Sequence, residues 1–425
     1  VVEEDTVVEQ QPVDDPSAED ATTDETESKA TQDESNSQAA GQAQEDSKAD
    51  DDVLNVNEAT RNITTGTNVN GNETWSGETI TVSGQGVIWP KGTLTIEDST
   101  IINESIRSTG YGEPLAIVVQ KTNGKLVLKG VIVEERGTSR RKFVALQEGT
   151  KLEAIDTIFN VNRTSYDPLI WVTQGSTADF ENVTFNGGDN LFDSTLIKVG
   201  GTPSNANAQG GTVNFKGENK ISNVRGLGNN YIDNNGTINI VNGTTVIENS
   251  VINLKNKGIV VKAGAILKLV NSYIRLNELG HNFAIKVEAG GTLIVDGSTI
   301  TNATKSSGSD AAYIMTDGGT IELKKALIDN NKNGFDNGSQ REGNIVNVKN
   351  GVLKVEDSKI TNNTTQVPGA IGLTNSTATF SNTEFTSNKA AFGGAINAKN
   401  SDVTISDCKF EENTVNRRGG AISME

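Results

Sequence analysis

Carboxylates are the side chains in this sequence that would most readily carry chemistry, because hydrolysis of a glycosidic bond needs two of them about 5–10 Å apart along one groove. Five isolated aspartates recur in the second half of the chain: Asp296, Asp317, Asp329, Asp357 and Asp407. Most of them stand at the Asp/Asn position of a repeated motif, where a role in a turn explains them. No two aspartates are adjacent after residue 52. We therefore expect no catalytic residue among them.

Two further residues are candidates for catalysis. The sole histidine, His281, lies in the turn-like segment Gly280-His281-Asn282 and has no evident partner in the sequence. The sole cysteine, Cys408, occupies the motif position that holds Ser272 and Ser358 in other repeats, and a nucleophile there would need a base that the sequence does not offer. We expect no metal site and no cofactor.

Trp171 is the strongest single candidate for ligand binding. Aligning residues 169–172 with residues 284–287 places it on the outward side of a strand, with Val118, Ala145 and Lys198 as neighbours on adjacent strands. An exposed indole on a flat sheet is a good stacking platform for a sugar ring. The alternative is that a loop covers it.

A second candidate binding region is formed by long connections in the first half of the chain. These connections should project from the same edge and carry Arg107, Tyr111, Arg136, Arg140, Arg141, Arg163 and Tyr166. Clusters of Arg and Tyr on stacked loops are typical of glycan or protein recognition. A solvated face without a ligand is the competing interpretation.

A repeated motif indicates the elements that would position these residues. It consists of Gly, two apolar residues in alternation, Asp or Asn, often Ser, and a third apolar residue followed by Asn. Its first apolar position recurs twelve times at steps of 25 to 35 residues: Leu94, Leu126, Leu152, Ala178, Val213, Ile238, Leu267, Leu293, Ile321, Leu353, Ala378 and Val403. Alternating apolar and β-branched residues predict about three short strands in each repeat.

A fixed period favours a right-handed parallel β-helix of about 12 coils, a single-stranded all-β solenoid. A β-sandwich has no such period, and a leucine-rich repeat would need a helix or a leucine-dense segment in each unit. Stacking would bring the third-corner asparagines into a ladder of amides: Asn103, Asn186, Asn223, Asn249, Asn277, Asn302, Asn330, Asn362, Asn388 and Asn413.

The first 52 residues differ in composition and charge from the rest of the chain. Residues 1–52 carry 18 acidic and two basic residues and hold almost all of the net charge of −18. A segment so acidic and so poor in apolar residues predicts a disordered leader. The nearly neutral remainder lacks the basic stripe that nucleic acid requires, and no apolar run reaches the roughly 20 residues of a membrane span. We expect a cap and first strands at 53–90 and the β-helix at 91–425.

The last repeats resemble a known family. The tetrapeptides FTSN at 385–388 and FEEN at 410–413 are followed by GGAI at 393–396 and again at 419–422. Paired FxxN and GGA[ILV] motifs resemble the repeats of chlamydial polymorphic membrane proteins and related bacterial adhesin-like β-helix proteins, which implies a surface-exposed β-helix used for adhesion.

The sequence therefore predicts a non-enzymatic, extracellular or cell-surface adhesin-like protein that binds a carbohydrate or a surface protein of a host or community partner. A secreted polysaccharide lyase or glycoside hydrolase of the same fold class and a purely structural spacer are the alternatives. We expect further coils or an anchoring domain to follow residue 425, because an open final coil would expose strand edges and core.

Overall fold

The computed structural model describes residues 59–106, 115–121, 123–136, 142–161, 168–187, 196–200, 210–227, 237–254, 258–276, 283–301, 304–305, 312–333, 343–418 and 420–425. The chain divides into two units, Val1–Val56 and Asn57–Glu425. The first unit, and with it the predicted disordered leader, lies outside the described residues. All the regular secondary structure of the described residues is β-strand.

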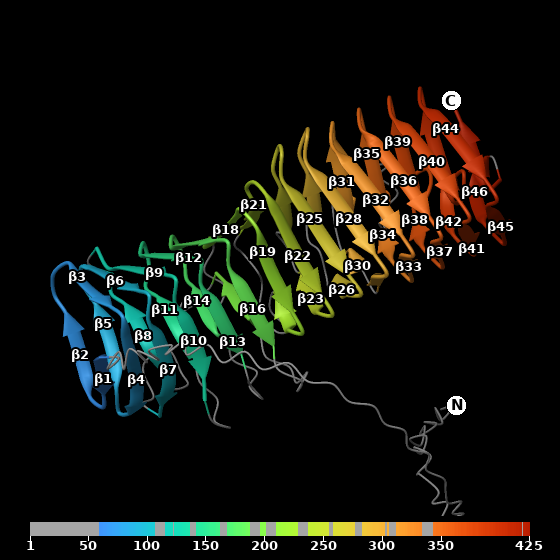
Figure 1. The fold of residues 1–425 in the computed structure, drawn as a ribbon. Helices are drawn as coiled ribbons and strands as arrows, with labels where there is room; N and C mark the ends of the chain where they lie inside the picture. The colour runs from blue at the N-terminus through green and yellow to red at the C-terminus, as the bar shows by residue number, and fades with distance from the viewer. Residues whose placement is uncertain are drawn as a thin grey trace, which may run out of the picture. The chain divides into compact units, whose positions relative to one another are not determined.

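Three long sheets make up the second unit, and every strand pairing in them is parallel (Figure 1). Sheet A contains β1 (Ala59–Ile63), β4 (Glu78–Gly84), β7 (Thr100–Ser105), β10 (Ile132–Glu135), β13 (Ile158–Val161), β16 (Thr184–Gly187), β19 (Asn219–Ser222), β22 (Thr244–Glu248), β25 (Ile266–Val270), β28 (Thr292–Asp296), β32 (Thr320–Lys324), β36 (Val352–Glu356), β40 (Thr377–Ser381) and β44 (Asp402–Ser406). Sheet B contains β2 (Gly66–Val69), β5 (Val87–Pro90), β8 (Leu115–Val119), β11 (Lys142–Leu146), β14 (Ile170–Val172), β17 (Ile197–Val199), β20 (Arg225–Leu227), β23 (Val251–Leu254), β26 (Tyr273–Leu276), β29 (Thr299–Thr301), β33 (Leu327–Asp329), β37 (Lys359–Thr361), β41 (Glu384–Thr386) and β45 (Lys409–Glu411).

Sheet C contains β3 (Glu73–Ser76), β6 (Thr93–Glu97), β9 (Lys125–Lys129), β12 (Lys151–Ile155), β15 (Thr177–Glu181), β18 (Thr212–Lys216), β21 (Thr237–Ile240), β24 (Ile259–Val261), β27 (Ile285–Val287), β31 (Ile314–Asp317), β35 (Val346–Lys349), β39 (Ile371–Thr374), β43 (Ile396–Lys399) and β47 (Ile422–Met424). A short fourth sheet, sheet D, contains β30 (Thr304–Lys305), β34 (Lys332–Asn333), β38 (Thr364–Thr365), β42 (Lys389–Phe392) and β46 (Thr414–Arg418). Each coil of the chain thus visits A, B and C in turn, and the predicted parallel β-helix is confirmed.

Side chains of like chemistry form columns because each strand lies in register on its image one coil away. In sheet C, Leu126 pairs with Leu94 and with Leu152, and all three are fully buried. Aromatic side chains stack in the same way, with ring centroids 4.7 Å apart for Phe159 and Phe185. Fully burying each such side chain is worth about 1.5–3 kcal/mol. One continuous apolar core therefore runs through the coils.

Trp75 and Arg61 pack against each other at the first coil of the core. Trp75 is buried in sheet C, and the Arg61 guanidinium lies 4.2 Å from the centre of its ring. Arg61 also makes a forked pair of hydrogen bonds, 2.6 and 2.8 Å long, to the Glu78 carboxylate of the next coil. The strands β1 to β5 already belong to the three sheets, so the regular coils begin at residue 59, within the segment expected to hold the cap and first strands.

The repeated motif changes sheet in the middle of the β-helix. Its copies up to Ile238 lie in sheet C, whereas those from Leu267 onward lie in sheet A. Leu267 accordingly pairs with Thr245, and Ile238 pairs with Ile259. The prediction that Leu267 continues the column of Ile238 is therefore wrong. Each of the three long sheets has fourteen strands, whereas the motif has twelve copies. The two coils without a copy are β1–β3 and β22–β24.

A buried asparagine ladder explains the FxxN tetrapeptides. Its members are Asn331, Asn363, Asn388 and Asn413, and each Nδ2 of the first three donates to the Oδ1 of the next at 2.9–3.0 Å. The Phe385 and Phe410 rings are stacked 4.8 Å apart in the core. The predicted ladder is confirmed at Asn388 and Asn413.

Elsewhere the predicted ladder needs correction. Asn330 and Asn362 each precede a ladder residue and adopt φ of 52° and 53°, the left-handed backbone that asparagine tolerates. Asn223 and Asn249 also have positive φ, at corners between sheets A and B. The predicted ladder residues Asn277 and Asn302 lie outside the described residues.

In the first GGA[ILV] tetrapeptide, Gly393 lies in close contact with the backbone of sheet C. A Cβ atom at Gly393 would lie 2.4 Å from the Ile396 carbonyl oxygen and 2.8 Å from the Ser423 amide nitrogen. Gly393 also has a φ of 48°, which a side chain would strain. Glycine is therefore required here by backbone contact between successive coils.

Replacing Asn363 with alanine should destabilise the β-helix by at least about 2 kcal/mol, because each buried partner left unpaired costs about 1–3 kcal/mol. Those partners are the Asn331 amide and the Ile328 carbonyl group. Urea denaturation followed by circular dichroism measures the shift. The control Asn186→Ala removes an exposed amide–amide bond to Asn160 and should shift stability by less than about 0.5 kcal/mol. Equal effects of the two substitutions would contradict the ladder.

Candidate functional site

The outward side of sheet C carries two groupings of polar side chains that do not serve the core. Register places one outward residue from each coil in a single column, including Glu153, Asp179, Asn214 and Asn239 in the first half. The same column continues in the second half through Asn347, Gly372 and Asn397. This face therefore holds two separate polar groups, a charged network and a pocket.

The charged network centres on Glu153 and Asp179, which are register partners on adjacent strands β12 and β15. Lys151 bridges them, with its Nζ 2.7 Å from the Glu153 carboxylate and 3.0 Å from that of Asp179. Lys125 lies 2.7 Å from Glu153, and Lys216 lies 3.5 Å from Asp179. Parallel strands are about 4.8 Å apart, slightly less than the roughly 5–5.5 Å between the two carboxyl groups of a retaining glycosidase.

Sequence reasoning missed this pair. It considered aspartates at the Asp/Asn corners, whereas Glu153 and Asp179 lie inside strands and become neighbours only through the register. The signal in the sequence is their spacing of one repeat, at equivalent positions of two aligned strands.

The protonation of this pair does not suit acid–base catalysis. Burial alone would raise the pKa of the Asp179 carboxyl, but the Asn214 amide and the Lys151 and Lys216 ammonium groups lower it below its usual value. Burial alone would also raise the pKa of the Glu153 carboxyl, but Lys125 and Lys151 lower it below its usual value. The Lys151 pKa is raised by hydrogen bonds to both carboxylates. Neither carboxyl is thus a proton donor near neutral pH, and Lys151 is not a free base.

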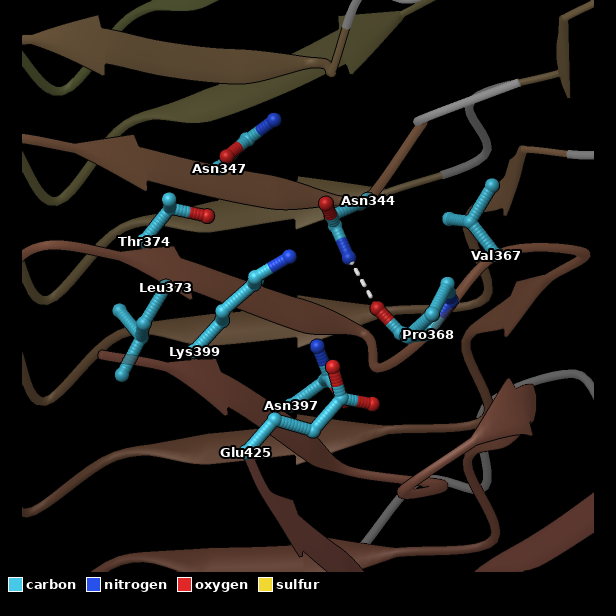
Figure 2. A pocket seen from close by; sticks show the side chains of 10 residues that line it. Asn344, Asn347, Val367, Pro368, Leu373, Thr374, Asn397, Lys399 and Glu425 are labelled. Carbon is cyan, nitrogen blue, oxygen red and sulfur yellow. Dashed lines mark hydrogen bonds between the residues drawn. The ribbon is translucent and has the colours of Figure 1, made fainter. Parts of the chain in front are cut away.

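The second polar group is a cavity of about 180 Å³, here called the amide pocket (Figure 2). It is lined by Asn344, Asn347, Val367, Pro368, Gly372, Leu373, Thr374, Asn397, Lys399 and Glu425. Figure 2 shows the three asparagine amides, Thr374 and the Lys399 side chain around one space over strands of sheet C. The pocket lies where the outward column passes through a glycine.

Gly372 lies between Asn347 and Asn397 in the column, and its lack of a side chain makes room for the Asn344 side chain. The Asn344 side chain lies over it: a Cβ atom at Gly372 would be 2.3 Å from Asn344 Oδ1. Asn344 Nδ2 in turn donates to the carbonyl oxygens of Pro368 and Gly369. One wall of the pocket is thus fixed by hydrogen bonds to backbone.

Asn397 forms the opposite wall and differs from Asn344. Its Oδ1 atom is buried and accepts no hydrogen bond from the described residues. Buried polar atoms are normally paired, since leaving one unpaired costs about 1–3 kcal/mol. The pocket therefore contains an acceptor without a donor.

Trp171 is placed as predicted along the sheet but is not exposed. It pairs with Ala145 and Lys198, and Ala145 pairs with Val118, so the predicted neighbours are confirmed. The indole is only 6 % exposed and packs in a small apolar cluster apart from the main core. Its Nε1 donates to the Gly200 carbonyl at 2.9 Å, and the Lys198 ammonium lies 4.2 Å from its ring centre. The expected open stacking platform is therefore absent.

The predicted Arg and Tyr cluster cannot be placed. Arg107, Tyr111, Arg140, Arg141, Arg163 and Tyr166 lie outside the described residues. The strands that flank them are described, and each of these connections leads from sheet A to sheet B, the same edge of the β-helix. Arg136 is described and makes an exposed ion pair with Glu134, with its Nη2 at 2.7 Å.

The other catalytic candidates have structural roles where they are described. Cys408 Sγ donates to the Ser406 carbonyl oxygen at 3.2 Å, and Ser272 and Ser358 make the same contact two residues back, at 2.8 and 2.7 Å. Asp329 and Asp357 accept hydrogen bonds from Asn362 and Asn382 of the next coil, as the turn interpretation predicts. His281 lies outside the described residues.

The described residues contain no cluster of three or more His, Cys, Asp or Glu side chains that would hold a metal ion. Nor do they contain a helix long and apolar enough to cross a bilayer.

The fold is that of a parallel β-helix protein. Comparisons with known proteins add little to this assignment. No protein-family model matches the chain, and no curated protein does. Among solved structures, a hyper-glycosylated fragment of TibA covers 86% of this chain and 98% of its own at 11% identity and a TM-score of 0.27. PfbA, a surface adhesin of Streptococcus pneumoniae, covers 80% and 82% at 11% identity and 0.27. The periplasmic alginate epimerase AlgG covers 83% and 78% at 12% identity and 0.24. Likenesses this small carry no argument about function.

The charged network should stabilise the protein above about pH 4 and lose that effect in acid. Because the folded-state pKa of Asp179 is lowered, its stabilisation is present above the unfolded pKa and disappears as pH falls through the folded one. Asp179→Asn should cost about 1–2 kcal/mol at pH 7. Denaturation at pH 7 and pH 3 measures the difference. Glu181→Gln, on the exposed end of the same strand, is the control. A cost for Asp179→Asn that is the same at both pH values would contradict this assignment.

Proposed function

We propose that the protein is a non-enzymatic, adhesin-like protein of the cell surface that binds a glycan or protein ligand on the outward side of sheet C. The observation that carries the proposal is the amide pocket, a hollow on the outward side of sheet C that three asparagines line. Amides with an unpaired acceptor suit recognition of polar groups rather than bond cleavage.

A polysaccharide lyase or glycoside hydrolase is the second candidate, and Glu153 with Asp179 is the observation that favours it. The two carboxylates are on register partners of adjacent strands, and lysines flank them. A glycoside hydrolase needs one carboxyl group that holds a proton. Both a hydrolase and a lyase need an acid or a base that is free to exchange a proton. Since ion pairs lower the pKa of both carboxyls, the network suits a structural role better.

The repeats at the end of the chain support the surface location. FxxN and GGA[ILV] each have a structural role here, in the asparagine ladder and in the glycine approach to sheet C. The resemblance to bacterial adhesin-like proteins therefore concerns the motifs that build these coils, and it supports a surface protein of that kind.

Binding and cleavage can be tested on the same ligands. The protein should bind at least one member of a panel of glycans and cell-surface proteins, and it should release no reducing sugar from the polysaccharides of that panel. A glycan array and a reducing-sugar assay measure the two properties. Release of sugar that is abolished by Asp179→Asn would establish the enzyme instead. Binding to nothing on the panel would favour the spacer.

A further inference from the structure

We infer that the amide pocket binds a neutral, hydroxyl-bearing sugar unit and that Asn397 Oδ1 is its principal acceptor. The inference rests on the proposed function and names the ligand class of that site. It is drawn from the unpaired acceptor, the size of the hollow and the charges around it.

The unpaired acceptor determines what the ligand must supply. Asn397 Oδ1 is buried and lacks a donor among the described residues, whereas the Asn344 amide opposite is fixed by two carbonyl oxygens. A carbonyl oxygen of this kind needs an O–H or N–H group from outside. Its free energy of burial is recovered when such a group reaches it, which requires the side chains around the atom to move.

The size of the hollow limits the ligand to one small group. Its volume of about 180 Å³ is below the roughly 300–1,000 Å³ of sites for drug-sized ligands. A hollow of this size takes a single ring with its hydroxyl groups rather than a longer oligosaccharide.

The location of the pocket favours a sugar over a peptide. An extended peptide is commonly recognised by adding a strand to the free edge of a sheet. The amide pocket instead opens on the face of sheet C, where the β35, β39 and β43 backbones are already paired with their neighbours. Side-chain amides are thus the groups offered, and they bond to hydroxyl groups as donor and acceptor.

The charges around the pocket favour a neutral sugar. Lys399 and Glu425 both line it, and their opposite charges offset one another. An acidic sugar would be attracted by one and repelled by the other. None of the ten described lining residues is aromatic, so hydrogen bonds rather than ring stacking hold the ligand. Each site is then weak, and attachment of a cell would depend on many copies.

The test uses the whole chain and arrays of immobilised neutral oligosaccharides, uronate-containing oligosaccharides and sialylated glycans. Asn397→Ala should lower binding to the neutral glycans at least tenfold. Its melting temperature should equal or exceed that of the wild type, because the substitution removes a buried unpaired acceptor. A residue kept only for structure would show the opposite pattern, with a lower melting temperature and unchanged binding.

One variant serves as a control. Asn239→Ala removes an amide from the same outward column, far along the chain from the pocket, and should leave binding within twofold. Neutral-glycan binding that survives Asn397→Ala, or binding of the uronate-containing or sialylated glycans in place of the neutral ones, would overturn the inference while leaving the proposed function in place. Absence of any ligand for the wild type would contradict the proposed function itself.

Discussion

The parallel register between successive coils is the constraint on which the rest of the structure depends. A single coil of three short strands cannot shield its own interior, so its apolar side chains are buried only when the neighbouring coils supply matching ones. This explains why Leu94, Leu126 and Leu152 follow one another in sheet C and why Phe385 and Phe410 stack with nearly parallel rings. Polar groups obey the same rule. Asn363 is stable in the interior because Asn331 and Asn388 provide the partners that water would otherwise provide.

The same constraint limits where function can lie. Every inward position is committed to a column, so ligand chemistry has to come from outward residues and from the connections between strands. On the outward side of sheet C, equal spacing brings residues one repeat apart into contact. At Glu153 and Asp179 this produces an ion-pair network, and around Gly372 it produces a pocket. The two outcomes differ because charges of opposite sign satisfy each other, whereas Asn397 Oδ1 is left with no donor among the described residues.

Much of the fold could be predicted from the sequence because period and alternation are visible in it. The outward position of Trp171 and its neighbours Ala145 and Lys198 followed from aligning the repeats. The change of sheet between Ile238 and Leu267 did not, since the motif looks the same on either sheet and only backbone pairing distinguishes them. The burial of Trp171 and the pairing of Glu153 with Asp179 depend on three-dimensional neighbours in the same way. The pocket was missed because a glycine in one coil matters only through the asparagines of the coils beside it.

Disulfide trapping tests the register most directly, at the point where the motif changes sheet. Val246 and Lys268 are outward register partners on β22 and β25. Cα atoms of such partners lie about 4.8 Å apart, within the roughly 4.4–6.8 Å that a disulfide spans. In a Cys408→Ser background, cysteines at 246 and 268 should cross-link under mild oxidation, and cysteines at 246 and 270, which are displaced by two residues, should not. Equal cross-linking of both pairs, or of the displaced pair alone, would contradict the stacked register.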